Sequence, residues 1–235
     1  MRRRSQGVVL PPARAETEEP WPSRWTPRGV TAALEPLVAP ARRERIRSVL
    51  ADRLVAVTVV MDAPHDPHNG GAVLRSCDAF GVQELHVVPR EEPFAISTTV
   101  TRGSEKWVDL VKHPSVPEAV ETLRNRGYEL VATHPRGSLV PEDLAKIPKL
   151  ALVLGNEHDG IREELERAAS RTVRVPMRGF VESLNLSVSA ALLLRAATAG
   201  RPGDLPEPDR ERLYARGLYK SVPRADRVLA AMTPG

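Results

Sequence analysis

The chain has 235 residues, of which 41% are hydrophobic and 27% are charged, so it is long enough for one globular domain with appendages. It contains no apolar run near the roughly 18 residues of a membrane helix, which excludes an integral membrane protein. Its one cysteine, Cys77, excludes a disulfide scaffold. Because no apolar signal-peptide segment follows Met1, we predict a cytoplasmic protein. The net charge is +4, and residues 1–53 carry 11 arginines against 6 acids, so basic flanks around a slightly acidic centre favour a polyanionic partner.

The N-terminal segment is rich in proline. Residues 1–40 contain seven of the 22 prolines and show no apolar period. Because this density of proline interrupts helices and central strands, residues 1–39 are predicted to be a largely disordered extension. Residues 40–54 then follow a helical period and are predicted to form a basic helix. Its apolar residues fall on one stripe: Ile46, Val49, Leu50 and Leu54.

From residue 55 onward, short apolar runs alternate with helical patterns. The predicted strands are 55–61, 85–88, 107–111, 128–133, 150–154 and 172–175. The predicted helices are 71–80, 117–126, 161–169 and 186–199. Strand 150–154 is apolar at every position, which is typical of a strand buried on both faces. We therefore predict an α/β domain over 55–200, with a parallel sheet covered by helices on both faces, and a C-terminal helical extension over 201–235.

The loops of this domain lack the common nucleotide-binding and hydrolase fingerprints. Residues 62–71 contain neither G-x-G-x-x-G nor G-x-x-x-x-G-K-[ST], which disfavours a standard dinucleotide site or a P-loop. No G-x-S-x-G surrounds Ser183, so it is not expected to be a hydrolase nucleophile. His65 and His68 have the spacing of two metal ligands, but they share a proline-containing turn without a convincing third ligand, and we expect no metal site.

Polar residues gather in three segments near the carboxyl ends of predicted strands: 68–81, 152–160 and 173–189. Ligands of open α/β sheets bind at this edge. Each segment also has a purely structural interpretation, because Asn69 and Asn185 are good helix N-caps and Gly155 suits a turn. Arg75 is equally compatible with a solvated helix face. Periodicity alone leaves both interpretations open.

Together and in this order, the three segments resemble the motifs of the SpoU/TrmH family of SPOUT RNA ribose 2′-O-methyltransferases. Residues 69–75 are similar to the first motif, 154–157 to the second and 175–187 to the third. The resemblance extends over roughly 42–200 and includes residues 101–107. With the basic helical flanks, it is closest to the TrmH branch, which methylates the D-loop guanosine at tRNA position 18.

The resemblance implies a SPOUT fold with a C-terminal trefoil knot, S-adenosylmethionine as methyl donor, no metal, and a homodimer that acts on tRNA. By position, it implies five residues of the cofactor pocket: Thr133, Gly155, Val175, Met177 and Leu184. It also implies five catalytic residues: Arg75, Asn69, Glu157, Ser183 and Asn185. The expected RNA-binding residues are His68, Arg42, Arg43 and Arg45.

The role of Arg75 follows from its chemistry. A free arginine is a poor general base because its pKa exceeds about 12. We therefore expect Arg75 to bind the adjacent phosphate and to orient or polarise the ribose 2′-hydroxyl.

Other functions remain open. The same chemistry could act on ribosomal RNA or on another tRNA ribose, or the protein could be a non-catalytic RNA-binding protein with the same knot. The presence of Arg75, Glu157, Ser183 and Asn185 together argues against a non-catalytic protein. An unrelated α/β enzyme would leave the order of the three motifs unexplained.

Overall fold

The computed structural model describes residues 8–9, 19–90, 95–156 and 158–233. The chain divides into two compact units. The larger unit comprises residues 1–15 and 55–201, and the smaller comprises residues 16–54 and 202–235. Within the described residues, no helix has the length and apolar character needed to cross a membrane.

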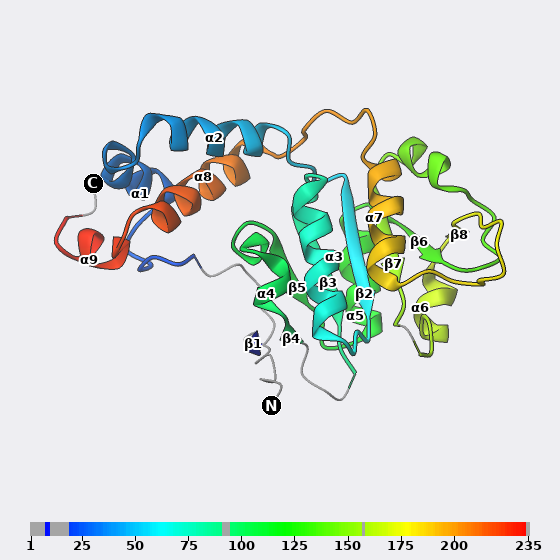
Figure 1. Ribbon diagram of the computed structural model, residues 1–235. Coiled ribbons are helices and arrows are strands. Elements are labelled where there is room, and N and C mark those ends of the chain that lie inside the picture. The colour runs from blue at the N-terminus through cyan, green and yellow to red at the C-terminus, as the bar shows by residue number, and fades with distance from the viewer. Residues whose placement is uncertain (1–7, 10–18, 91–94, 157, 234–235) are drawn as a thin grey trace. The chain divides into compact units, whose positions relative to one another are not determined.

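The larger unit is built on a six-stranded sheet with the order β5-β3-β2-β7-β6-β8 (Figure 1). Its strands are β2 (Val57–Asp62), β3 (Glu84–Val88), β5 (Asp109–Lys112), β6 (Glu129–Thr133), β7 (Leu150–Leu154) and β8 (Arg171–Val173). Every neighbouring pair is parallel, with Met61 opposite Leu154 and Thr133 opposite Val173. The carboxyl ends of β2, β7, β6 and β8 therefore meet at one edge, and the predicted parallel sheet is confirmed.

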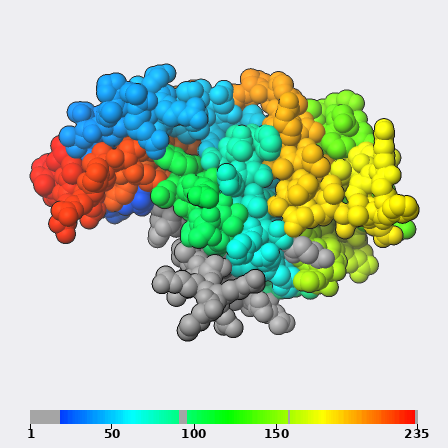
Figure 2. Space-filling view, viewed as in Figure 1, coloured from blue at the N-terminus to red at the C-terminus, as the bar shows by residue number. Residues whose placement is uncertain are grey.

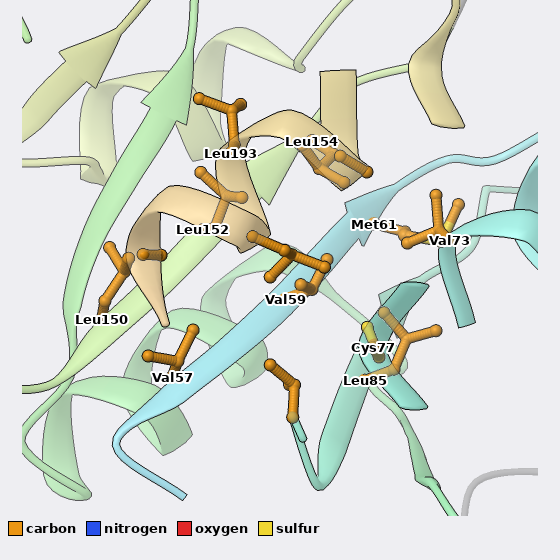
Figure 3. Packing of buried hydrophobic residues seen from close by; sticks show 14 of the residues in the cluster. Val57, Val59, Met61, Val73, Cys77, Leu85, Leu150, Leu152, Leu154 and Leu193 are labelled. Atoms are coloured by element: carbon orange, nitrogen blue, oxygen red, sulfur yellow. The ribbon is translucent and has the colours of Figure 1, made fainter. Parts of the chain in front are cut away.

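Helices cover both faces of this sheet, as predicted. On one face, α3 (Pro67–Ala79), α7 (Leu186–Ala197) and the 3₁₀ helix η3 (Pro141–Lys146) pack on side chains such as Val59 and Leu152 (Figure 3). On the other face, α5 (Val116–Asn125) and α6 (Glu163–Ala168) pack on Val60 and Val153. Successive strand residues point to opposite faces, so a strand buried on both sides is apolar throughout.

Several element boundaries differ from the predicted ones. Helix α3 begins at Pro67 rather than at residue 71, because the Asp66 side chain accepts a hydrogen bond from His68 N at 2.8 Å. The interpretation of Asn69 as the N-cap is therefore wrong. In contrast, Asn185 does cap α7, since its Oδ1 accepts from Ser187 N at 2.8 Å.

Short elements of the larger unit were not predicted. They are α4 (Thr98–Thr101), the 3₁₀ helix η2 (Ser104–Lys106), η3, and a two-stranded antiparallel pair of β1 (Val8–Val9) with β4 (Ala95–Ile96). Trp107 N donates to Ser104 O at 2.9 Å and thereby completes the turn of η2. Strand β5 therefore begins at Asp109 rather than at residue 107. Such one-turn elements are too short to produce a hydrophobic period.

The smaller unit is helical. It contains α1 (Pro27–Leu34), the 3₁₀ helix η1 (Glu35–Leu37), α2 (Pro40–Ala51), α8 (Glu207–Ser221) and α9 (Ala225–Ala230). Its core joins residues from both ends of the sequence, including Trp25 and Leu34 with Leu218 and Leu229. The flanking helices expected at both ends of the chain thus share one core.

The predicted disorder of 1–39 is wrong for residues 19–39. Two prolines of this segment stand in the first turn of a helix, Pro27 in α1 and Pro36 in η1, as Pro40 does in α2. The missing N–H of proline is not needed there. Thr26 caps α1 by accepting from Gly29 N at 3.1 Å. Residues 1–7 and 10–18 lie outside the described part of the chain.

A buried histidine pair lies at the β3–β5 side of the sheet. His86 Nδ1 and His113 Nε2 are 2.8 Å apart and share a hydrogen bond, and the two rings stack with centroids 5.1 Å apart. Both side chains are buried. Burial, together with the neighbouring His86 and Arg126, lowers the pKa of His113 to about 4.

This pair predicts a pH-dependent stability. Unfolded His113 takes up a proton near pH 6.5 whereas the folded side chain stays neutral to about pH 4, so stability is lost as pH falls between these values. We expect the free energy of unfolding to drop by up to about 3 kcal/mol across this window. Urea unfolding at several pH values checks this. His113→Gln should flatten the slope and His158→Gln, at an exposed site, should not; an unchanged slope in His113→Gln contradicts the assignment.

Candidate functional site

A cavity of about 690 Å³ opens at the carboxyl ends of β6, β7 and β8. Its volume lies within the range of small-molecule sites, about 300–1,000 Å³. Apolar residues form part of its wall, among them Leu154, Ile161, Val175 and Leu193. Hydroxyl and amide side chains form another part, among them Thr133, Asn156, Ser183 and Ser189. Such a wall suits a ligand with both a flat apolar group and polar groups.

The structure brings most of the predicted site residues to this cavity. All five residues of the predicted cofactor pocket line it: Thr133, Gly155, Val175, Met177 and Leu184. Two predicted catalytic residues, Ser183 and Asn185, line it as well. Glu157 lies outside the described residues. The expected site residues did not include His134, Asn156, His158 and Glu182, which also line the cavity and each adjoin an expected site residue in sequence.

The loop after β7 is held from within by Asn156. The Oδ1 atom of Asn156 accepts from the backbone N of His158 at 2.8 Å and of Asp159 at 2.7 Å, while Asn156 N donates to Gly160 O at 3.1 Å. The side chain is 7% exposed, and its Nδ2 has no hydrogen-bond partner among the described residues. A buried donor without a partner is costly, so an acceptor on a bound ligand would stabilise this loop.

The far end of the same loop is held by a buried ion pair. Arg162 Nε donates to Asp62 Oδ1 at 2.6 Å, and the backbone N of Arg162 donates to Asp62 Oδ2 at 2.6 Å. Arg162 Nη2 also donates to Val88 O at 3.1 Å. The Asp62 side chain is completely buried, whereas that of Arg162 is 25% exposed. The loop is thereby fixed to the carboxyl ends of β2 and β3.

Two glycines permit close backbone contacts beside the cavity. A Cβ atom at Gly155 would lie 2.3 Å from the carbonyl carbon of Gly160, and one at Gly137 would lie 2.4 Å from that of Val173. Contacts this short are essentially never seen for real Cβ atoms, so both positions require glycine. Segment 134–139 follows segment 172–174 closely, since His134 N donates to Val173 O and Arg174 N to Leu139 O.

The first motif meets the third through a hydrogen bond between α3 and α7. Asn185 Nδ2 donates to Asn69 Oδ1 at 3.2 Å. Arg75 lies further along α3 and is exposed, outside the lining of the large cavity. It lines instead a hollow of about 450 Å³ between α3 and α7, where Val188 and Leu192 of α7 are also exposed. The predicted catalytic residues are therefore divided between two neighbouring surfaces.

The predicted RNA-binding residues are polar groups at the surface. His68 is exposed in the first turn of α3. In the smaller unit, Arg42 and Arg45 of α2 are exposed and Arg43 is half-buried. Arg42 Nε donates to Ser221 Oγ of α8 at 3.2 Å.

Comparison with known proteins gives consistent matches. Residues 56–195 match the SpoU rRNA Methylase family. A tRNA (guanosine(18)-2′-O)-methyltransferase of Thermus thermophilus is 38% identical over 189 residues, which cover 79% of this chain and 90% of that protein. The crystal structure of the Aquifex aeolicus TrmH/SpoU tRNA modifying enzyme has a TM-score of 0.70 and 30% identity, and covers 78% of this chain and 98% of that one.

A solved structure with a ligand is also similar. The SpoU methyltransferase AviRb of Streptomyces viridochromogenes, in complex with the cofactor AdoMet, has a TM-score of 0.55 and 30% identity. The match covers 64% of this chain and 60% of that one. The family match over residues 56–195 spans all three motifs and every residue that lines the cavity.

Proposed function

The chain belongs to the SpoU rRNA Methylase family, and from this premise we propose that it transfers the methyl group of S-adenosylmethionine to a ribose 2′-hydroxyl of tRNA, at guanosine 18 of the D-loop. One observation carries the proposal: the cavity at the carboxyl edge of the sheet gathers all five expected cofactor residues with Ser183 and Asn185. The tRNA specificity rests on the relatives that match over most of the chain.

The walls of the cavity fit S-adenosylmethionine. Leu154, Val175 and Leu193 offer apolar surface for the adenine ring, and the unpaired Nδ2 of Asn156 offers a donor for an acceptor of the ligand. Residues Thr133, Gly155, Val175, Met177 and Leu184 would hold it. The bound cofactor supplies a methyl group already activated on a sulfonium, so this transfer requires no metal.

Gly155→Ala tests this pocket. The added methyl group would meet the backbone at Gly160, so the loop after β7 has to move. A displacement of about 1 Å can cost about 10²-fold in the rate of a preorganised site, and we expect the affinity for S-adenosylmethionine to fall by the same order. Isothermal titration calorimetry measures it. Gly179→Ala is the matched control, since a Cβ there meets nothing within 4 Å; equal affinities in the two variants would contradict the assignment.

The residues of the chain divide the remaining work. Asn185 is a positioning residue, because its Oδ1 caps α7 at Ser187 and its Nδ2 holds Asn69. Arg75 binds the phosphate beside the target ribose and orients the 2′-hydroxyl. Ser183, on the cavity wall, is placed to donate to the cofactor or to the acceptor ribose. Glu157 completes the expected catalytic set.

We further propose a homodimer with a knotted chain. The exposed Val188 and Leu192 beside Arg75 would be buried by a second copy, which would bring Arg75 into the interface. The knot is what the likeness of the fold to this family implies. The basic residues His68, Arg42 and Arg45, which are exposed, and the half-buried Arg43 would contact tRNA phosphates in the cytoplasm. Light scattering of Leu192→Asp, expected to be monomeric, tests the interface.

The decisive experiment uses methyl-labelled S-adenosylmethionine and unmodified tRNA, followed by position-resolved mass spectrometry of nucleosides. We expect labelled 2′-O-methylguanosine at position 18 of the D-loop. Label in ribosomal RNA instead would retain the chemistry and change the substrate to the one that the name of the SpoU rRNA Methylase family gives. No label in either RNA, despite binding of S-adenosylmethionine, would overturn the enzymatic function.

A further inference from the structure

The segment between β8 and α7 presents unusually exposed apolar side chains. Residues 176–183 are all exposed. Phe180 is 108% exposed relative to an extended reference, and its neighbour Val181 is 61% exposed. In Figure 2 the yellow part of the chain, which contains this segment, forms the surface at the right of the view. An aromatic ring wholly in water forgoes the stabilisation that burial would give, so a partner that covers it gains binding energy.

The position of Phe180 separates it from the cofactor. Met177 on one side and Glu182 on the other line the large cavity, but Phe180 does not. The segment therefore forms the rim of the cavity, with Phe180 outside. A group that approaches the cavity to receive the methyl group passes this rim.

On this basis, and resting on the proposed function, we propose that Phe180 stacks on a nucleobase of the acceptor RNA at or next to the methylated nucleotide. Unpaired bases of RNA are bound by stacking on aromatic side chains, and phosphates by arginine. Arg178 and Arg174 are exposed on the same segment and supply the positive charge that such a strand requires. Phe180 is thus a specificity-determining residue rather than part of the cofactor site.

A second copy of the chain is the weaker candidate for covering Phe180. A stable interface buries about 800 Å² on each partner. Phe180 and Val181 are only two apolar side chains, between Arg178 and Glu182. The surface that we assign to a second copy is instead the hollow between α3 and α7, where Val188 and Leu192 are exposed.

Steady-state kinetics with unmodified tRNA tests the proposal. We expect Phe180→Ala to lower kcat/KM for tRNA about 5–150-fold, the range for loss of one stacked base, and to leave S-adenosylmethionine affinity unchanged. Phe180→Tyr should restore kcat/KM because stacking needs only an aromatic ring. Val181→Ala, at the adjacent exposed apolar position, should remain near wild type.

A second readout is independent of catalysis. The fluorescence of Phe180→Trp should be quenched by tRNA beyond the change seen in the wild type, because an indole stacked on a base is quenched. The proposal is overturned if Phe180→Ala has the kinetics of the wild type. It is also overturned if Phe180→Ala loses activity because the variant no longer forms the oligomer of the wild type. If the wild type does not methylate tRNA, the proposed function fails, whereas added quenching by tRNA still supports the contact with RNA.

Discussion

Arg75→Ala is expected to abolish measurable methyl transfer to tRNA while it leaves the affinity for S-adenosylmethionine unchanged. Arg75 is exposed on α3 and is absent from the lining of the cofactor cavity, so its removal does not alter that pocket. Loss of one preorganised charged donor at the reacting centre lowers kcat by at least about 10²–10³-fold. Single-turnover methylation and calorimetric titration of the cofactor measure the two quantities separately.

The control for this variant is Arg195→Ala, which removes another exposed arginine from the larger unit and should retain activity. Arg75→Lys keeps the positive charge but loses the planar, bidentate geometry suited to phosphate, so it should recover little activity. If Arg75→Ala instead lost the cofactor, Arg75 would belong to the binding pocket, and its assignment to the acceptor phosphate would be wrong.

Arg162→Met is expected to destabilise the larger unit by about 3 kcal/mol, because it leaves the buried Asp62 carboxylate without its charged partner. Removal of one partner of a buried ion pair costs about 3–5 kcal/mol. The backbone N–H of Arg162 still donates to Asp62 in this variant, so we expect a loss at the lower end of this range. The loop after β7 loses its anchor at the same time, so S-adenosylmethionine should bind more weakly. Urea unfolding and calorimetry measure the two effects.

Arg167→Met provides the matched control on the same stretch of chain. Arg167 pairs with Glu163 on α6, and both side chains are 74% exposed. Exposed pairs contribute little, about 0–1 kcal/mol, so this variant should unfold close to the wild type. Equal losses of stability in Arg162→Met and Arg167→Met would show that burial of Asp62 is not the cause.

The sheet was predictable from sequence because strands buried on both faces are apolar at every position, as in Leu150–Leu154. The strand order and the contact of segment 134–139 with 172–174 were not, because periodicity does not encode which strands become neighbours. Helix α1 was missed because proline was interpreted as a helix breaker, although Pro27 follows the N-cap Thr26.

The site was only partly predictable. The residues of its cavity come from three separate stretches of the chain, around Thr133, Gly155 and the segment from Val175 to Leu184, which hydrophobic periodicity does not connect. Motif order and resemblance identified them, whereas the structure places Arg75 at a different hollow. The Asp62–Arg162 pair was missed because its members are 100 residues apart in sequence.

The shared core of the smaller unit has a consequence for biosynthesis. Residues 19–54 are translated before the methyltransferase domain, but Trp25 and Leu34 pack on Leu218 and Leu229, which are translated after it. At about 5–20 residues per second, the nascent α1 and α2 wait on the order of ten seconds for α8 and α9. The methyltransferase domain between them can fold meanwhile. The helices translated before the domain therefore reach their native packing only after the domain has been made, and loss of residues 202–235 would leave them without a core.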